Sequence, residues 1–140
     1  MNYYLKNMLK YPIRTLKLFY RVARGCEESE ISVDELHDHT KSNEPLLVID
    51  IRSAKEFNGD TGHIPHSKHI PIRELRSNLE VLQSFKEKKI VTYCPGGGLS
   101  LIAVDLLVEA GFQDVKSLHG GLDLWIEKGY PTIMSKSNRI

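Results

Sequence analysis

Two short, almost wholly apolar runs, LLVID at 46–50 and IVTY at 90–93, most strongly restrict the folds open to this chain. A strand with one face in water alternates apolar and polar residues, whereas a continuous apolar run predicts a strand buried on both faces. Strands of this kind belong to parallel sheets that carry helices on both sides. A third short run, DVKSL at 114–118, is also expected to be a strand.

Segments with helical spacing or helix-end signals separate these runs. The expected helices are a short one capped by the SVDE box at 32–35, one over 74–85, one that follows the glycines and stops at Gly111, and a last one stopped by Gly129. Helices that alternate with buried strands predict an α/β fold with a mostly parallel sheet and right-handed crossovers.

Between the strand at 90–93 and the next helix lies the segment CPGGGLS, residues 94–100. Glycine has the most backbone freedom to lose, so three in succession indicate a backbone shape that other residues cannot adopt. Cys94 would stand at the carboxyl end of a central strand, where open α/β sheets place their ligand sites. The N–H groups of a tight glycine loop and the positive end of a helix dipole both favour an anion there. We expect the glycines to form a cradle for a thiolate or persulfide, open to a bulky sulfur donor.

Three segments resemble, in order, the signatures of single-domain rhodaneses, a family of sulfurtransferases: VIDIRSAKEFNGDTGHIPHSKHIP at 48–71, YCPGGGLS at 93–100 and GFQDVKSLHGGLDLWIEKGYPT at 111–132. The resemblance implies a five-stranded, mostly parallel sheet with helices on both faces. It also implies that Cys94 is the catalytic residue that carries the persulfide. The persulfide-binding loop would consist of Pro95, Gly96, Gly97, Gly98, Leu99 and Ser100.

The loop departs from the family pattern at two positions. The family usually has Cys-Arg-x-Gly-x-Arg-Ser/Thr here, whereas Pro95 and Leu99 occupy the two arginine positions in this chain. Those arginines would attract anionic thiosulfate through charge-assisted hydrogen bonds. Without them the cradle depends on backbone N–H groups, the helix dipole and the Ser100 hydroxyl. A persulfide, polysulfide or protein persulfide is therefore a better expected donor than thiosulfate.

Two functions compete on these residues. The leading hypothesis is a sulfurtransferase that passes sulfane sulfur through Cys94 to a thiol, cyanide or a carrier protein, with no metal or organic cofactor. The alternative is a catalytically weak rhodanese-fold module for binding or regulation, which the missing arginines favour. Some dual-specificity phosphatases share the fold, but their longer loop ends in a phosphate-clamping Arg. Position 100 is Ser here, which argues against that activity.

Other polar residues are expected to support the fold. Asp50 and Arg52 end the first apolar run and are candidate supporting residues, although a buried pair that holds loops together is the preferred interpretation. The spacing of His63, His66 and His69 fits no common zinc pattern, so no metal site is expected. His119 is a further candidate for the edge of the pocket. Trp125 is interpreted as core packing of the last helix.

The first 24 residues carry six Lys or Arg and no Asp or Glu, while the rest is acidic on balance. Their apolar residues recur at helical spacing, interrupted by Pro12. Such a helix could lie on an anionic membrane surface or dock on a partner, but we favour packing on the domain or on a second copy. Nucleic acid is not an expected partner. The predicted organisation is a basic extension at 1–29, a rhodanese-like domain at 30–133 and a polar tail at 134–140.

The location of the protein is also predicted from the sequence. Two cysteines, Cys26 and Cys94, are too few for a disulfide scaffold, and no run reaches transmembrane length. The N-terminus lacks the features of a secretory signal. We therefore expect a cytoplasmic protein in a reducing compartment, in which Cys94 is the reactive thiol and Cys26 lies outside the matched domain.

Overall fold

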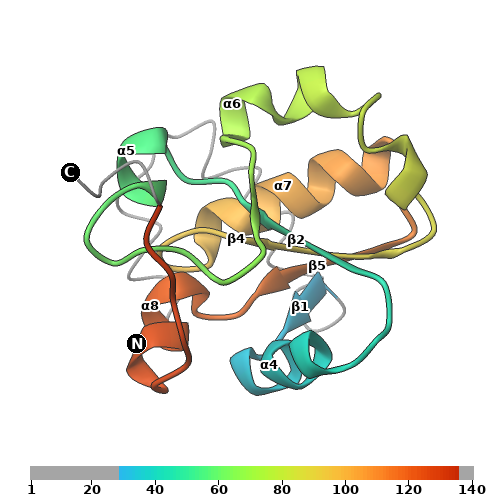
Figure 1. The fold of residues 1–140 in the computed structure, drawn as a ribbon. Coiled ribbons are helices and arrows are strands. Elements are labelled where there is room, and N and C mark those ends of the chain that lie inside the picture. Colours follow the sequence, from blue (N-terminus) through green and yellow to red (C-terminus); the bar gives the residue numbers. More distant parts are fainter. Residues whose placement is uncertain (1–28, 136–140) are drawn as a thin grey trace.

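The computed structural model describes residues 29–135, which contain a parallel sheet of five strands (Figure 1). The strands are β1 (Glu30–Ile31), β2 (Leu46–Asp50), β3 (Lys68–His69), β4 (Lys89–Tyr93) and β5 (Asp114–Leu118). Their order is β1-β5-β4-β2-β3, and every neighbouring pair is parallel. The strand that leads to Cys94, β4, therefore has two strands on one side and two on the other. The predicted α/β fold with a parallel sheet is confirmed.

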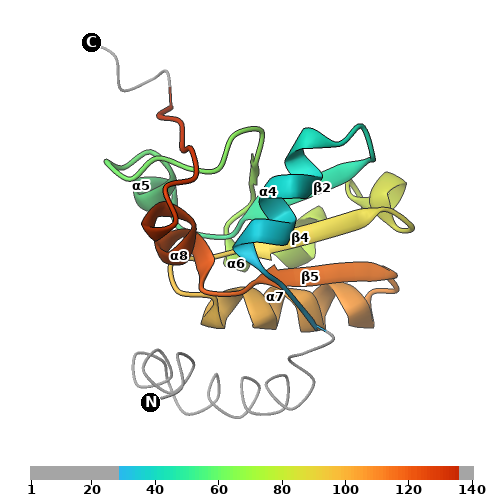
Figure 2. The ribbon, with the colours of Figure 1, turned by 90° about the horizontal axis from the view of Figure 1, so that it is seen from below.

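Helices cover both faces of the sheet, as predicted. They are α4 (Val33–Lys41), α5 (Ala54–Phe57), α6 (Ile72–Leu75), α7 (Gly98–Glu109) and α8 (Gly121–Glu127). In Figure 1, α6 and α7 lie toward one face and α4 and α8 toward the other. Figure 2 shows α7 running along β5, which it contacts extensively. None of the helices in residues 29–135 is long and apolar enough to cross a membrane.

The two continuous apolar runs feed two separate cores. In β2, Ile49 packs into the cluster under α7 and Val48 packs into the cluster under α4 and α8. The next strand repeats this alternation, with Ile90 on the α7 side and Val91 on the opposite side. Successive residues of a strand point to opposite faces, so an apolar run without interruption is what a sheet covered on both sides requires.

The helix predicted over 74–85 is wrong as a single element. It is broken into α6, two 3₁₀ turns at Arg76–Asn78 and Gln83–Phe85, and intervening turns. Ser77 and Asn78 both donate side-chain hydrogen bonds to the carbonyl of Glu74, which competes with regular helical pairing. The spaced apolar residues still pack in the core, because Leu75 and Leu82 are fully buried in the cluster under α7.

Serine caps mark the starts of two short helices, α4 and α5. Ser32 caps α4 by accepting a hydrogen bond from the N–H of Glu35, as predicted. The reciprocal capping box is formed by a different pair, Ser53 and Glu56, at the start of α5. Each cap satisfies an N–H group that has no partner within its helix.

The central strand should tolerate loss of volume poorly. Ile90 is fully buried in β4, whereas Val81 is 65% exposed. Ile90→Ala should lower the free energy of unfolding by about 2–5 kcal/mol, because it removes buried methyl groups and leaves a cavity. Val81→Ala should change it by less than about 0.5 kcal/mol. Urea unfolding of the two variants measures the difference, and equal effects would contradict the assignment of Ile90 to the core.

Candidate active site

The thiol of Cys94 lies where the loop after β4 meets the start of α7. Its Sγ accepts hydrogen bonds from the backbone N–H of Gly97 at 3.1 Å and from that of Ser100 at 3.4 Å. It also lies 3.5 Å from Ser100 Oγ, to which the thiol donates. Backbone N–H groups that converge on one atom make that position favourable for negative charge. Of the predicted loop of residues 95–100, Gly97 and Ser100 thus contact the sulfur directly.

The N-terminal cap of α7 is Gly97, which has a φ of +92°. This left-handed backbone turns the Gly97 N–H toward the sulfur, and it is costly for residues with a side chain. A Cβ at this position would also meet Gly120 N at 3.0 Å and Leu118 O at 3.2 Å. Of the three successive glycines, this one has a clear conformational requirement.

The start of α8 holds the loop from the other side. The N–H groups of Leu122 and Asp123 donate to the carbonyls of Cys94 and Pro95, each at 2.9 Å. The approach is close because Gly121, with a φ of +61°, has no side chain: a Cβ there would lie 2.3 Å from Cys94 O and 2.8 Å from Gly97 N. Gly121 is thus a structural residue of the site. The only sign of it in the sequence is the glycine pair at 120–121.

A further residue of the site, Ser117, carries no sequence signal. It lies in β5, and its Oγ is 2.6 Å from the Oγ of Ser100. A serine inside a strand is ordinary, and the contact joins two elements that are distant in sequence. Only the packing of α7 on β5 brings the two hydroxyls together.

The loop was expected to be open to a donor, but in the structure it is closed around the thiol. Cys94 is 0% exposed and belongs to the apolar cluster under α7. Gly97, Gly98 and Ser100 are buried as well, while Pro95, Gly96 and Leu99 are half-buried. Small residues let neighbouring backbone pack against the loop and close it rather than leaving space. Any molecule that reacts at Sγ would have to reach it after a movement that uncovers the thiol.

Asp50 and Arg52 form a buried ion pair beside the site. The Arg52 guanidinium donates to both carboxylate oxygens, the shortest contact being 2.7 Å, and also to the carbonyl of Gly62. Burial opposes the charge on Arg52, but the hydrogen bonds and the charge of Asp50 outweigh it and raise the pKa of Arg52. This geometry ties the end of β2 to the loop that contains Gly62, which is the structural role preferred for the pair.

The side chain of Tyr93 points away from the thiol. It packs in the cluster under α4 and α8, and its hydroxyl lies 3.1 Å from Ile64 N and 2.9 Å from Ser67 Oγ. Burial, reinforced by the negative charge of Asp50, raises the pKa of Tyr93, so its phenol is neutral at physiological pH. Tyr93, the last residue of β4, and Cys94, which follows it, thus face opposite sides of the sheet, with the thiol on one side and a structural hydrogen-bond network on the other.

The histidines serve the fold in different ways. The rings of His63 and His69 both stack on the ring of Phe57 in α5, with centroids 3.9 and 4.4 Å away. His119 follows β5 and is bonded to Glu30 at 2.8 Å. Among the residues that the structure describes, no group of three or more His, Cys, Asp or Glu could hold a metal ion. Trp125 is buried in the cluster under α8, as predicted.

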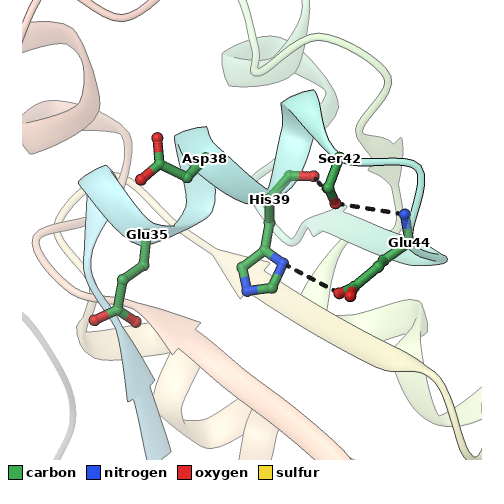
Figure 3. A pocket seen from close by; sticks show the side chains of 5 residues that line it. All are labelled: Glu35, Asp38, His39, Ser42 and Glu44. Atoms are coloured by element: carbon green, nitrogen blue, oxygen red, sulfur yellow. Dashed lines mark hydrogen bonds and ion pairs between the residues drawn. The ribbon is translucent and has the colours of Figure 1, made fainter.

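A shallow hollow along α4 is distinct from the Cys94 loop (Figure 3). It is lined by Glu35, Asp38, His39, Ser42 and Glu44. Its polar groups bond to one another: Ser42 Oγ accepts from Glu44 N, and His39 lies 3.9 Å from the Glu44 carboxylate. These contacts stabilise the turn between α4 and β2.

Comparison with known proteins decides the family. A model of the rhodanese-like domain matches residues 32–128. The chain belongs to the rhodanese-like domain family. A sulfurtransferase of Allochromatium vinosum is 28% identical over 105 residues, which cover 75% of this chain and 94% of that protein. The probable adenylyltransferase/sulfurtransferase MoeZ of Mycobacterium tuberculosis is 30% identical over 112 residues, but the match spans only 28% of its length.

Solved structures agree with this membership. A rhodanese-related protein of Thermoplasma volcanium superimposes with a TM-score of 0.67 at 32% identity, over 76% of this chain and 99% of that one. A thiosulfate sulfurtransferase of Pseudomonas aeruginosa superimposes with a TM-score of 0.74 over 84% of this chain and 22% of that one. At 20% identity, the second similarity shows the fold alone. The family membership and the rhodanese fold predicted from the sequence are thus confirmed. Cys26 and the basic extension lie outside the described residues.

The close approach at Gly121 can be tested against a matched glycine. Gly129 also has a left-handed backbone, with a φ of +80°, but a Cβ there would meet nothing within 4 Å. Gly129→Ala should therefore cost only the conformational term, about 1–2 kcal/mol. Gly121→Ala adds a clash with backbone atoms, so it should lower stability further and displace the Cys94 loop. Thermal melting measures the first effect, and amide chemical shifts of residues 94–100 measure the second. Similar results for the two variants would contradict the close approach.

Proposed function

We propose that this protein is a sulfurtransferase in which Cys94 carries sulfane sulfur as a persulfide. The observation that supports this most directly is the convergence of the Gly97 and Ser100 N–H groups on Cys94 Sγ. The same groups, with the first turn of α7 behind them, suit both a thiolate and the anionic outer sulfur of a persulfide. The names of the relatives provide independent support, because several are sulfurtransferases.

The reaction divides into two displacements at sulfur. In the first, the Cys94 thiolate attacks the outer sulfur of a persulfide donor, forms an S–S bond and releases the rest of the donor as a thiolate. In the second, an acceptor nucleophile attacks the outer sulfur of the Cys94 persulfide, and Cys94 departs as a thiolate with the bonding electron pair. The acceptor is a thiol, a carrier protein or, in the test tube, cyanide. No net oxidation occurs, and the cycle is of the ping-pong type.

Neutral groups surround the sulfur in this loop, and this bears on the choice of donor. Position 99, where the family usually has an arginine, holds Leu99, whose side chain packs against the apolar cluster under α7. Backbone N–H groups stabilise an anionic sulfur once it is bound, but they provide no long-range attraction for a dianion such as thiosulfate. We therefore propose that the donor is a persulfide or polysulfide rather than thiosulfate.

The persulfide step is tested by mass spectrometry. After exposure to a small persulfide donor and removal of excess donor, the wild-type protein should gain the mass of one sulfur atom. Cys94→Ser should gain none, whereas Cys26→Ser should still gain it, since Cys26 lies outside the domain that holds the cradle. Subsequent addition of cyanide should remove the added mass and yield thiocyanate. Absence of the sulfur adduct in wild type would favour a binding or regulatory module instead.

Donor choice is tested by returning a charge to the loop. Leu99→Arg should raise the specificity constant for thiosulfate relative to that for a persulfide by about 10- to 100-fold, because a charge-assisted hydrogen bond contributes about 1.5–3 kcal/mol. Leu99→Gln is the matched control, since it loses the apolar packing without gaining a charge. The ratio should stay near the wild-type value in that variant. A wild type that already prefers thiosulfate strongly would contradict the proposal.

A further inference from the structure

Two buried hydroxyl groups lie behind the reactive sulfur and share one backbone acceptor. Ser100 Oγ and Ser117 Oγ are 2.6 Å apart, and both residues are 0% exposed. Ser100 Oγ lies 3.1 Å from the carbonyl oxygen of Gly97, and Ser117 Oγ lies 3.4 Å from the same atom. Ser100 Oγ is also 3.5 Å from Cys94 Sγ. The Ser100 hydroxyl is therefore within reach of three alternative partners.

The Gly97 carbonyl depends on these two hydroxyl groups for its hydrogen bonds. At the start of α8, the corresponding cap carbonyl of Gly120 accepts the N–H of Leu124 at 3.2 Å. At the start of α7, the Gly97 carbonyl is instead bonded by the Ser100 and Ser117 hydroxyls. A state of the protein in which a buried carbonyl has no hydrogen-bond donor is destabilised. The Ser100 hydroxyl can rotate to donate to the sulfur at little cost only if another group donates a hydrogen bond to the Gly97 carbonyl.

We propose that Ser117 is a positioning residue for Cys94: its hydroxyl donates to the Gly97 carbonyl when the Ser100 hydroxyl turns to an anionic sulfur. The inference rests on the proposed function, because the anionic sulfur is the thiolate or the persulfide of that cycle. Ser117 contacts neither donor nor acceptor and acts only through Ser100 and Gly97.

The proton positions balance in both states. With a neutral thiol, Cys94 donates to Ser100 Oγ, Ser100 donates to the Gly97 carbonyl, and Ser117 donates to Ser100 Oγ. With an anionic sulfur, Ser100 donates to the sulfur and Ser117 donates to the Gly97 carbonyl. Each change is a rotation of one hydroxyl about its Cβ–O bond. The Gly97 carbonyl keeps a donor throughout, and the sulfur gains a third donor beside the two backbone N–H groups.

Several ionisable side chains lie at this edge of the sheet and must be separated from the effect of Ser117. They are Asp50 at the end of β2 and Arg52 just after it, Tyr93 on β4, Glu30 on β1 with His119 after β5, and Asp123 in the first turn of α8. Asp50 pairs with Arg52, Glu30 pairs with His119, and Tyr93 points to the opposite face. A variant that removes a different buried hydroxyl on the same face of the sheet leaves all these ionisable side chains in place. Such a variant therefore serves as a control.

The chain offers such a control in Thr92, which is the register partner of Ser117 on β4. Thr92 is also 0% exposed, and its hydroxyl donates to the backbone carbonyl of Ser100 at 2.9 Å rather than to the side chain. Thr92→Val and Ser117→Ala each remove one buried hydroxyl that bonds to the first turn of α7. Comparable losses of stability are expected, but only the second variant removes the alternative donor for Gly97.

The readout is the pH titration of the Cys94 thiolate, followed by its ultraviolet absorbance in the full chain after subtraction of the Cys94→Ser spectrum. Ser117→Ala should move the midpoint upward by about one pH unit, because the thiolate state then leaves either the sulfur or the Gly97 carbonyl short of a donor. Thr92→Val should leave the midpoint unchanged. In a Ser100→Ala background, Ser117→Ala should have no further effect on the midpoint, since the two residues act through one relay.

An unchanged midpoint in Ser117→Ala, an equal shift in Thr92→Val, or an additive shift in the double variant would each overturn the proposal. The titration needs no sulfur donor, so it decides the role of Ser117 even if the protein takes up no sulfur. The rate of persulfide formation at a pH below the midpoint supplies the functional counterpart. It should fall about tenfold in Ser117→Ala, in line with the smaller thiolate fraction.

Discussion

The geometry around Cys94 depends on the close approach between the start of α8 and the loop after β4. Two N–H groups of α8 hold the carbonyls of Cys94 and Pro95, and Gly121 leaves the space that this approach needs. Because these carbonyls bond to α8, the Gly97 and Ser100 N–H groups of the same loop can point toward the sulfur. Glycines from two separate segments meet here: a Cβ at Gly121 would clash with backbone atoms of the Cys94 loop, and one at Gly97 would lie only 3.0 Å from Gly120 N.

Backbone N–H groups and a hydroxyl group, rather than a cation, lie around Cys94 Sγ. The charged residues nearest along β2 are paired with each other, and Arg52 binds the Gly62 loop instead of the sulfur cradle. Dipoles act over short distances, so they stabilise an anion already in place better than they attract one from solution. Under the proposed function, a fully buried thiol in such surroundings requires a donor that is recognised by features beyond its charge, after a movement that exposes the sulfur.

The sequence predicted the parts of the fold that have a local signal. The strands at 46–50, 90–93 and 114–118 and the helix that ends before Gly111 lie where their patterns place them. The prediction of one helix over 74–85 was wrong. The apolar spacing is helical, but the side chains of Ser77 and Asn78 compete for the carbonyl of Glu74. The strands β1 and β3 have only two residues each, too few for any periodicity, and were expected only from the family resemblance.

The amino-acid sequence by itself determined the α/β class, the place of Cys94 at the end of a buried strand and the absence of arginine from its loop. Apolar runs, helix-end glycines and residue identities are local properties, and they can be read along the chain. Only the tertiary structure decided that the thiol is buried, that Gly121 fits against its loop and that Ser117 meets Ser100. These contacts join residues of different elements across the sheet edge, and they exist only after α7 and α8 pack beside β5.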